Sequence, residues 1–269
     1  MTVFSNPLLD IWIEGRSPLL INIPHAGTYV PISIRADLSA DAQNIPDADW
    51  HIHLLYGFAA ELGVSLMTAT HARYVVDLNR DPENRPLYPG ADNSELVPTH
   101  SFDCLPLYRD GRTPDAAAVA ARLERYWHPY HRALRNRLEA IRTRHGYAIL
   151  LDAHSIRSEV PRFFDGRLPD LNLGTADGAS CSRSLEAAVW GALSSLGRFS
   201  AVRNGRFKGG YITREYGRPE RGIHALQLEI VQCSYMNEYP PYGWNPVRAT
   251  PLQESLKPIL EVMLSWTPS

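Results

Sequence analysis

The chain has 269 residues, and its 27 basic and 29 acidic side chains give a formal net charge of −2. This balance gives no electrostatic reason to expect a nucleic acid or an anionic membrane as a partner. With 44% hydrophobic and 21% charged residues, the composition is typical of a globular protein, and the length suits one α/β domain over residues 1–269.

The cysteines and the N-terminal segment bear on the cellular compartment. Cys104, Cys181 and Cys233 are widely spaced and odd in number, so we expect neither a disulfide framework nor a zinc knuckle, and a reducing compartment fits. The N-terminus lacks the basic and apolar parts of a signal peptide, and no apolar run reaches the roughly 20 residues that span a bilayer. We therefore expect a cytoplasmic protein, while the sequence leaves its oligomeric state open.

The first half of the chain contains short apolar runs that predict strands and one segment with a helical pattern. Residues 18–24 predict a buried strand, and residues 64–70 and 73–79 predict two more. Residues 47–63 predict a helix, because apolar side chains recur at helical spacing and Gly63 can end it. Residues 81–114 are polar and contain several prolines, so we expect an ordered surface excursion that is suited to form a wall of a site.

The second half of the chain alternates helices with strands. The expected elements are a long helix over residues 114–145 with a break near Pro129, a strand over 147–153, a helix over 181–196, a strand over 223–231 and a final helix over 252–266. This alternation predicts an α/β layered fold with a parallel or mixed sheet, and no segment has the composition of a linker between domains.

Three of the predicted strands end near side chains that can bind a metal or move a proton. His25 follows the first strand, His154 follows the strand over 147–153, and Glu229 stands late in the strand over 223–231. In open α/β sheets, sites gather at the carboxyl ends of the strands. A single histidine after a strand is more often an ordinary loop residue, but three such endings in one sheet favour a common site.

Two histidines need a third ligand to make an open catalytic zinc site. The acid-rich segment over residues 46–51 is the best source, through Asp47 or Asp49. The alternative is that these acids cap a helix, with His51 and His53 on its surface. Glu229 lies on an otherwise apolar strand, where a buried carboxylate costs several kcal/mol unless it is paired. It is therefore either the partner of a buried arginine or a general base beside an activated water.

Two further segments are suited to bind an anion. Asn79 and Arg80 follow a predicted strand, and arginine can hold a carboxylate through two parallel hydrogen bonds. The alternative there is an asparagine turn with a surface arginine. Residues 204–217 combine Arg206, Lys208 and Arg214 with paired glycines, as in a flexible loop that closes over an anion. The paired glycines are not a phosphate loop, because the chain lacks both glycine-rich phosphate-binding motifs, and the absence of a G-x-S-x-G elbow disfavours a serine hydrolase.

Seven blocks carry a resemblance to a known family, and they occur in the order expected for it. They are PHAGTYVP (24–31), DADWHIHLLY (47–56), RYVVDLNRDP (73–82), PLYRDG (106–111), LLDAHSIRSEVPRFFDGRLPDLNLGTADGASC (150–181), NGRFKGGYITREYG (204–217) and HALQLEIVQCSYMNE (224–238). Over nearly its whole length the chain resembles N-formylglutamate amidohydrolase, also called N-formylglutamate deformylase. The resemblance implies a zinc-carboxypeptidase-like α/β fold of the phosphorylase/hydrolase-like type, with a three-layer mixed sheet and helices on both faces. It also implies hydrolysis of N-formyl-L-glutamate to formate and L-glutamate, the last step of a histidine degradation route.

The resemblance also implies residue roles, with two departures. Distant relatives, the aspartoacylases and succinylglutamate desuccinylases, share an LNR element that holds a substrate carboxylate, and residues 78–80 match it. In those relatives a glutamate follows the first metal histidine by three residues, whereas Thr28 stands there in this chain. We therefore expect the acidic ligand elsewhere and prefer Asp49 to Asp47. The second departure is His53, at a position where the family leads us to expect an aspartate.

The implied centre contains Zn²⁺, or another divalent transition metal, held by His25, Asp49 and His154, with Glu229 as general base. Around it, Asn79 and Arg80 bind one carboxylate of a small dicarboxylate substrate, Arg73 or Arg214 helps with the second carboxylate or the oxyanion, and Asp152 orients a metal ligand. Two alternatives stay open: a zinc amidohydrolase of another N-acyl amino acid, and a non-catalytic carboxylate-binding protein on the same scaffold. The intact histidines and Glu229 disfavour the second.

Overall fold

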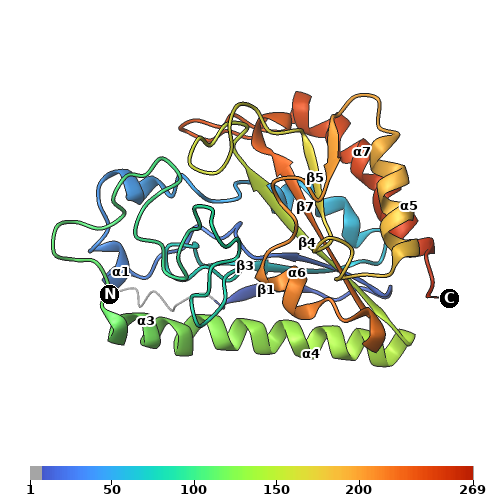
Figure 1. The fold of residues 1–269 in the computed structure, drawn as a ribbon, viewed down its shortest axis with the longest axis horizontal. Helices are drawn as coiled ribbons and strands as arrows, with labels where there is room; N and C mark the ends of the chain where they lie inside the picture. The colour runs from blue at the N-terminus through green and yellow to red at the C-terminus, as the bar shows by residue number, and fades with distance from the viewer. Residues whose placement is uncertain (1–7, 269) are drawn as a thin grey trace.

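The computed structural model describes residues 8–268, which form one seven-stranded mixed sheet (Figure 1). The strands at its centre run parallel, with β3 beside β2, β2 beside β4, and β4 beside β7. β1 pairs antiparallel with β3 at one edge, and β5 pairs antiparallel with β7 near the other. In spatial order the strands are β1 (Asp10–Ile13), β3 (Ser65–Ala69), β2 (Leu19–Ile23), β4 (Ala148–Ile156), β7 (Ile223–Val231), β5 (Leu171–Gly174) and β6 (Ala201–Arg203).

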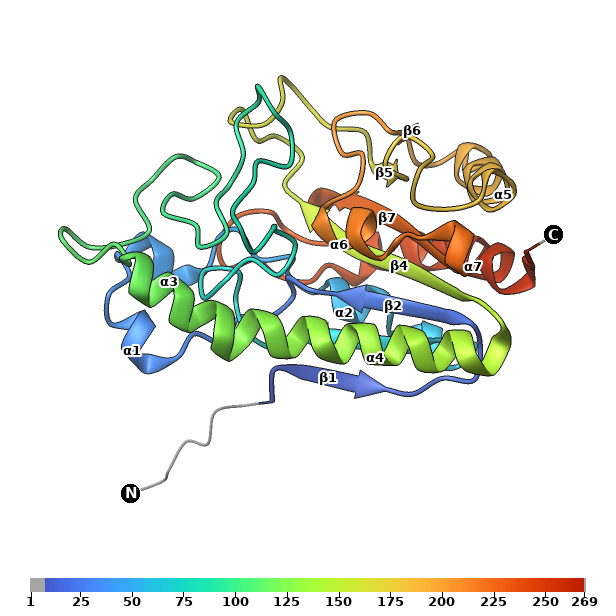
Figure 2. The same cartoon turned by 60° about the horizontal axis from the view of Figure 1, so that its bottom comes forward.

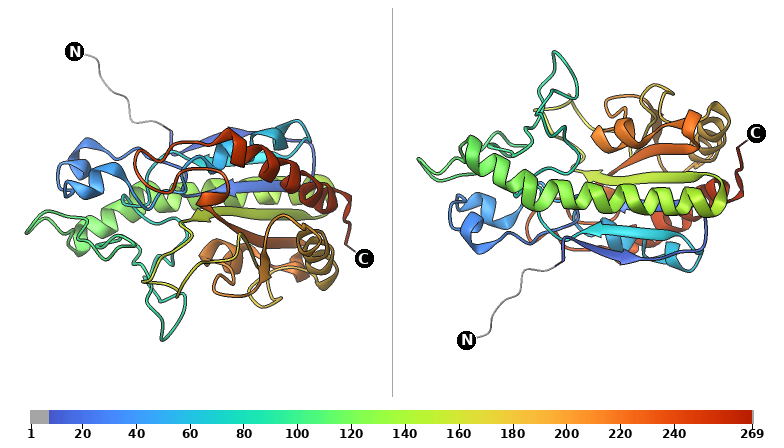
Figure 3. Two further views of the ribbon diagram at one scale, coloured as in Figure 1. Left: turned by 90° about the horizontal axis from the view of Figure 1, so that it is seen from above. Right: turned by 90° about the horizontal axis from the view of Figure 1, so that it is seen from below.

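Helices cover both faces of this sheet, which confirms the predicted three-layer α/β arrangement. The long helix α4 and the short helix α6 pack on one face, whereas α5 and α7 pack on the other (Figures 2 and 3). The α-helices are α1 (Ile32–Arg35), α2 (Ile52–Leu55), α3 (Ala116–Arg122), α4 (His128–His145), α5 (Arg183–Ser194), α6 (Tyr211–Tyr216) and α7 (Pro246–Ser265). Within residues 8–268, no helix combines the length and the apolar character that crossing a bilayer requires.

The alternation of side chains along β4 and β7 separates the two faces. The apolar residues that point toward α5 and α7 continue along each strand, as Leu226, Leu228 and Ile230 do in β7. On the α4 face, apolar residues at the start of each strand give way to polar ones near its carboxyl end. The polar residues on that face are Asn22 of β2, Asp152 and His154 of β4, and Gln227 and Glu229 of β7.

Most of the predicted elements are confirmed. Residues 18–24, 64–70, 147–153 and 223–231 contain β2, β3, β4 and β7, residues 181–196 contain α5, and α7 begins six residues before the predicted start. The helix over 114–145 is interrupted before Pro129 by a π-helical segment, η3 (Leu123–Trp127). Proline lacks an N–H and its ring clashes with the carbonyl four residues earlier, so a widened turn at this point relieves both problems.

The predicted helix over residues 47–63 is wrong. Only α2 and a 3₁₀ turn, η2 (Gly57–Ala60), form there. Asp47 and Asp49 are buried and bind side chains of other segments instead of capping a helix. His51 has a φ of 61°, a left-handed conformation that a right-handed helix cannot contain.

The predicted strand over residues 73–79 is also wrong, because this segment is a buried loop of turns. Its backbone groups find partners outside the sheet. The N–H of Asp77 donates to the carbonyl of Leu96, and the Arg122 guanidinium donates to the carbonyls of Tyr74 and Val75. A buried loop of this kind has the apolar composition of a central strand, which explains the error.

Candidate metal centre and active site

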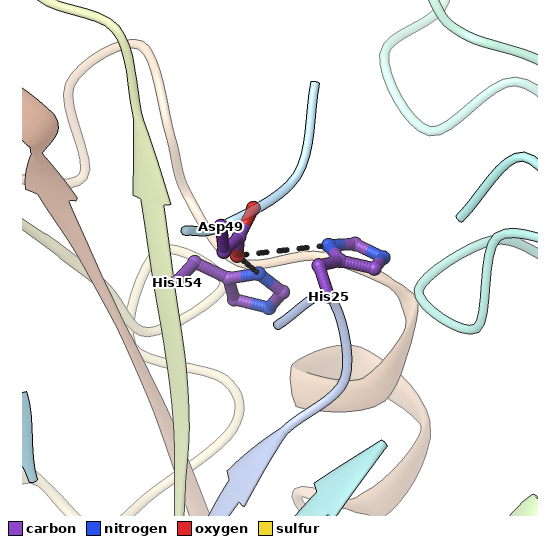
Figure 4. Close-up of side chains that lie close together, drawn as sticks. All are labelled: His25, Asp49 and His154. Atoms are coloured by element: carbon purple, nitrogen blue, oxygen red, sulfur yellow. Dashed lines mark hydrogen bonds and ion pairs between the residues drawn. The ribbon is translucent and has the colours of Figure 1, made fainter. Parts of the chain in front are cut away.

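Three potential metal ligands meet at the carboxyl end of the sheet. His25 follows β2 by two residues, His154 lies in β4, and Asp49 lies in the loop before α2. One ligand atom of each lies within 4.8 Å of the others, and all three side chains are buried (Figure 4). The Asp49 Oδ2 atom is 3.1 Å from His154 Nδ1 and 3.8 Å from His25 Nδ1.

Carboxylates fix the outer nitrogen of each histidine. His25 Nε2 lies 2.7 Å from Asp77 Oδ1, and His154 Nε2 lies 2.9 Å from Asp152 Oδ2. When the outer nitrogen donates to a carboxylate, the inner Nδ1 keeps its lone pair and can bind a metal. The position of Asp152 agrees with the orienting role expected for it, whereas Asp77 was not predicted.

Asp152 is itself held by a chain of hydrogen bonds that begins on α4. The Tyr130 hydroxyl donates to Asn22 Oδ1 over 2.7 Å, and Asn22 Nδ2 donates to Asp152 Oδ1 over 2.8 Å. These groups are almost fully buried, so each polar atom depends on the next for its partner. The chain therefore couples the packing of α4 to the orientation of His154.

The donor set fits a zinc ion. Two imidazole nitrogens and one carboxylate oxygen match the three protein ligands of open catalytic zinc sites, which keep one position for water or substrate. Asp47 does not join the cluster, because its Oδ2 atom accepts hydrogen bonds from the Tyr74 hydroxyl and the Phe102 N–H. His53 is exposed on α2. The geometry therefore favours Asp49 over Asp47 as the acidic ligand.

Burial and neighbouring charges shift the pKa values of the two histidines in opposite directions. Burial lowers the pKa of His154, but the carboxylates of Asp152 and Asp49 outweigh it and hold this pKa well above the ordinary value. Burial and the Arg73 cation together lower the pKa of His25, against the opposing effect of Asp77. The two histidines thus differ although both contact carboxylates, because only His25 has an arginine at its inner nitrogen.

Glu229 lies beside His154, its direct partner in the register of β4 and β7. Burial raises the pKa of Glu229 to about 7. Gln227 Nε2 donates to Glu229 Oε2 over 3.2 Å, and the Gly210 N–H fixes the Gln227 amide by donating to its Oε1 over 2.7 Å. Within residues 8–268, no arginine or lysine nitrogen lies within 4.0 Å of the Glu229 carboxylate. The buried-arginine alternative therefore has no support in these contacts.

A cleft opens above the histidines and Glu229, and Asn79 and three arginines also line it, namely Arg73, Arg80 and Arg206. Arg73 Nη2 lies 2.5 Å from His25 Nδ1 and 2.9 Å from Asp49 Oδ1, at the centre of the ligand cluster. Asn79 Nδ2 lies 3.0 Å from His154 Nε2. The sequence thus identified several residues that the fold brings to one cleft.

Arg214 is not brought to this cleft. It lies on α6 and lines a neighbouring cavity, which shares Asn79, Arg80 and Leu87 with the cleft. Its Nε atom donates to the carbonyl of Gly209. Arg206, from the same predicted anion loop, lines the cleft instead.

Sequence reasoning missed Asp77, Asn22 and Gln227. Asn22 and Gln227 interrupt buried apolar strands, and this is the signal that identified Glu229, so the same criterion applied to every strand would have found them. Asp77 also interrupts an apolar run, RYVVDLN over residues 73–79, so the same criterion would have found it.

The sequence is similar to a known family and to proteins of known name. The model of the N-formylglutamate amidohydrolase family matches residues 17–236. The chain belongs to this family. It is 46% identical over 253 residues to an N-formylglutamate deformylase of Pseudomonas putida, which covers 94% of both chains. It is 47% identical to an N-formylglutamate deformylase of Pseudomonas aeruginosa, covering 94% of this chain and 95% of the relative.

Solved structures agree with membership of the N-formylglutamate amidohydrolase family. The crystal structure of N-formylglutamate amidohydrolase from Ralstonia eutropha JMP134 superposes with a TM-score of 0.78 at 27% identity and covers 93% of this chain and 95% of that one. A gene product of Agrobacterium tumefaciens shares the fold at 18% identity, with a TM-score of 0.70 and coverage of 95% and 96%.

Proposed function

We propose that this chain is a zinc-dependent N-formylglutamate deformylase, a single catalytic domain that hydrolyses N-formyl-L-glutamate to formate and L-glutamate. The observation that carries the proposal is the convergence of His25, Asp49 and His154 beside Glu229, in a cleft lined by arginines. Relatives that are 46% and 47% identical carry the name of this activity. We also propose, as the family resemblance implies, that the reaction occurs in the cytoplasm as the last step of a histidine degradation route.

The residues divide the chemistry of amide hydrolysis among them. His25, Asp49 and His154 would hold the zinc ion, which when bound would supply a Lewis acid and lower the pKa of water at the site. Glu229 accepts the proton that water loses when its oxygen attacks the formyl carbon, and returns it to the amino group as the C–N bond breaks. A carboxylate whose pKa is raised to about 7 is suited to both transfers at neutral pH.

Arginines and Asn79 hold the charged parts of the substrate. Arg80 uses three N–H groups to donate to the Asn79 carbonyl and to the carbonyl and hydroxyl of Ser94. A guanidinium has five N–H donors, so one remains on each terminal nitrogen for a carboxylate. Arg73 lies close enough to the metal ligands to stabilise the developing oxyanion. Arg214 attracts the dicarboxylate toward Arg80, which lines both cavities.

The test combines metal analysis with formate release. Purified protein should contain about one zinc ion per chain, lose activity to a chelator and regain it with Zn²⁺. His154→Ala should lose metal and activity together, whereas His53→Ala, which changes an exposed histidine, should keep both. Full metal content in His154→Ala would remove this histidine from the site.

A comparison of substrates distinguishes the deformylase from the second candidate function, a zinc amidohydrolase of another N-acyl amino acid. We expect kcat/KM to be highest for N-formyl-L-glutamate among its formyl, acetyl and succinyl analogues. Faster turnover of an acetyl or succinyl substrate would favour the second candidate. Ligand binding without turnover of any substrate would identify a carboxylate-binding protein.

A further inference from the structure

Arg206 is a cation in the cleft with no acidic partner. Its side chain lines the same cleft as Arg80, His154 and Glu229. Within residues 8–268, no carboxylate oxygen lies within 4.0 Å of its guanidinium. A half-buried arginine that has no counter-ion in the protein is suited to an anionic ligand.

The aromatic surroundings hold this guanidinium in place. Arg206 Nε donates to the carbonyl of Phe163, and the guanidinium carbon lies 4.9 Å from the ring centre of Tyr88 and 5.4 Å from that of Phe207. The Tyr88 hydroxyl in turn accepts the N–H of Lys208. These contacts use Nε and leave the N–H groups of both terminal nitrogens for a ligand. The arginine is therefore oriented before a ligand arrives, which reduces the entropy lost on binding.

The nearby acid does not neutralise Arg206. Asp92 also lines the cleft, but both of its oxygens accept from Arg162, over 3.0 and 3.1 Å. Of the three arginines that line the cleft, Arg73 pairs with Asp49, so Arg206 and Arg80 remain as the two guanidinium groups for two carboxylates. Arg80 follows Asn79, which contacts His154, whereas Arg206 lies against the aromatic rings of Tyr88 and Phe163.

We propose that Arg206 binds the side-chain carboxylate of the substrate and sets the preference for an acidic N-formyl amino acid. This inference rests on the proposed function. The α-carboxylate is joined directly to the carbon that bears the reacting amide, so it belongs to Arg80 near the metal ligands. The side-chain carboxylate of glutamate extends two methylene groups further, to Arg206. A neutral amide at that position cannot replace the charge-assisted bidentate pair.

Two nearly isosteric substrates test this assignment. Wild-type protein should prefer N-formyl-L-glutamate to N-formyl-L-glutamine in kcat/KM. Arg206→Gln should lower kcat/KM for N-formyl-L-glutamate by about 10²-fold, mainly through KM, and change the value for N-formyl-L-glutamine by less than about threefold. For N-formyl-L-glutamate, the kcat/KM of Arg206→Lys should lie between those of wild type and Arg206→Gln, because lysine keeps the charge but cannot form two parallel hydrogen bonds.

Two further arginine variants separate Arg206 from its neighbours. Arg203→Gln is the matched control, since Arg203 is exposed on β6 and stacks on Trp190 at 5.3 Å but lies outside the cleft. Its kinetics should equal those of wild type. Arg214→Gln tests the rival arginine of the same loop. If Arg214→Gln abolishes the preference and Arg206→Gln does not, the proposal is overturned. Equal losses on both substrates in Arg206→Gln would mean that this arginine only supports the loop.

A binding measurement distinguishes failure of this inference from failure of the proposed function. Calorimetry with L-glutamate and L-glutamine needs no turnover. Arg206→Gln should weaken binding of L-glutamate by about 10²-fold relative to L-glutamine, even if no N-formyl amino acid is hydrolysed. Unchanged affinity for L-glutamate in Arg206→Gln would overturn the assignment, whatever the activity of the wild-type protein.

Discussion

The two faces of the sheet are built from the same strands but differ along their length. Toward α5 and α7 most strand residues are apolar, as Leu226, Leu228 and Ile230 of β7 illustrate, and the polar His224 at the start of β7 packs against Trp266. Toward α4 and α6 the same strand continues from Ala225 to Gln227 and Glu229. One face therefore stays a largely hydrophobic core, and the other becomes a polar site at the carboxyl ends of the strands.

The difference shows how a buried site can coexist with a stable sheet. Burying polar groups costs free energy unless they are hydrogen-bonded, and on the α4 face they bond to one another. The chain from Tyr130 through Asn22 and Asp152 to His154 satisfies each atom in turn. Apolar burial on the opposite face contributes free energy of folding that does not depend on the site. Adjacent residues of one strand should consequently respond to mutation in different ways.

Glu229→Gln should produce the largest effect on activity. Glutamine has nearly the same shape and can still accept a hydrogen bond from Gln227, but it cannot take a proton from water. We expect kcat to fall roughly 10²- to 10⁴-fold, with little change in melting temperature or zinc content. Measuring all three on one preparation checks this. A variant that is destabilised yet keeps most of its turnover would contradict the role of Glu229 as general base.

Leu228→Ala, one residue before Glu229 and on the opposite face, should lower stability and leave activity unchanged. Leu228 is 1% exposed in the core shared with α7, so truncation leaves a cavity and should lower the free energy of unfolding by about 2–5 kcal/mol. At a temperature where the variant is folded, kcat should be unchanged. Chemical denaturation and kinetics on the same sample measure the two quantities. A fall in kcat comparable to that of Glu229→Gln would show that the two faces are not independent.

The sequence predicted the parts of the fold that have continuous apolar runs bounded by turns. β2, β4 and β7 were found for this reason, and the rule that sites lie at strand ends placed His25 and His154 together. β5 and β6 have only four and three residues, too few to give a periodic signal. Their absence from the prediction reflects short length rather than an unusual composition.

Long-range partners explain what the sequence could not predict. The spacing of apolar residues over 47–63 is helical, but the pattern does not reveal that Asp49 bonds to Arg73 and that Asp47 bonds to Tyr74. The loop over 73–79 has the composition of a strand, and only the fold shows that Arg122 satisfies its carbonyls. The position of Arg206 likewise depends on Tyr88 and Phe163, which are distant in sequence.

The last prediction concerns pH and the packing of α4 on the α6 side of the sheet. His131 of α4 is buried and stacks on Trp127 at 3.7 Å, and its Nε2 atom donates to the Leu78 carbonyl while Nδ1 accepts from the Tyr216 hydroxyl. Burial lowers the pKa of His131 to about 3. An unfolded chain has a histidine pKa of about 6.5, so between these values the unfolded state binds the extra proton. The stabilising effect of the neutral imidazole is therefore complete above about pH 6.5 and is lost as pH falls toward 3.

His131→Phe removes this titration while keeping an aromatic ring against Trp127. At pH 7 the variant should be less stable by about 1–3 kcal/mol, because the Leu78 carbonyl loses its donor and the Tyr216 hydroxyl keeps only the backbone carbonyl of residue 131. Between pH 6 and pH 4 that gap should shrink, by at most about 1.4 kcal/mol per pH unit, since only wild type loses stability through this histidine. Carboxylates that titrate over the same range contribute equally to both proteins and cancel in the difference. Denaturant unfolding of both proteins at several pH values measures the gap, and a gap that stays constant from pH 7 to pH 4 would show that His131 is not the titrating group.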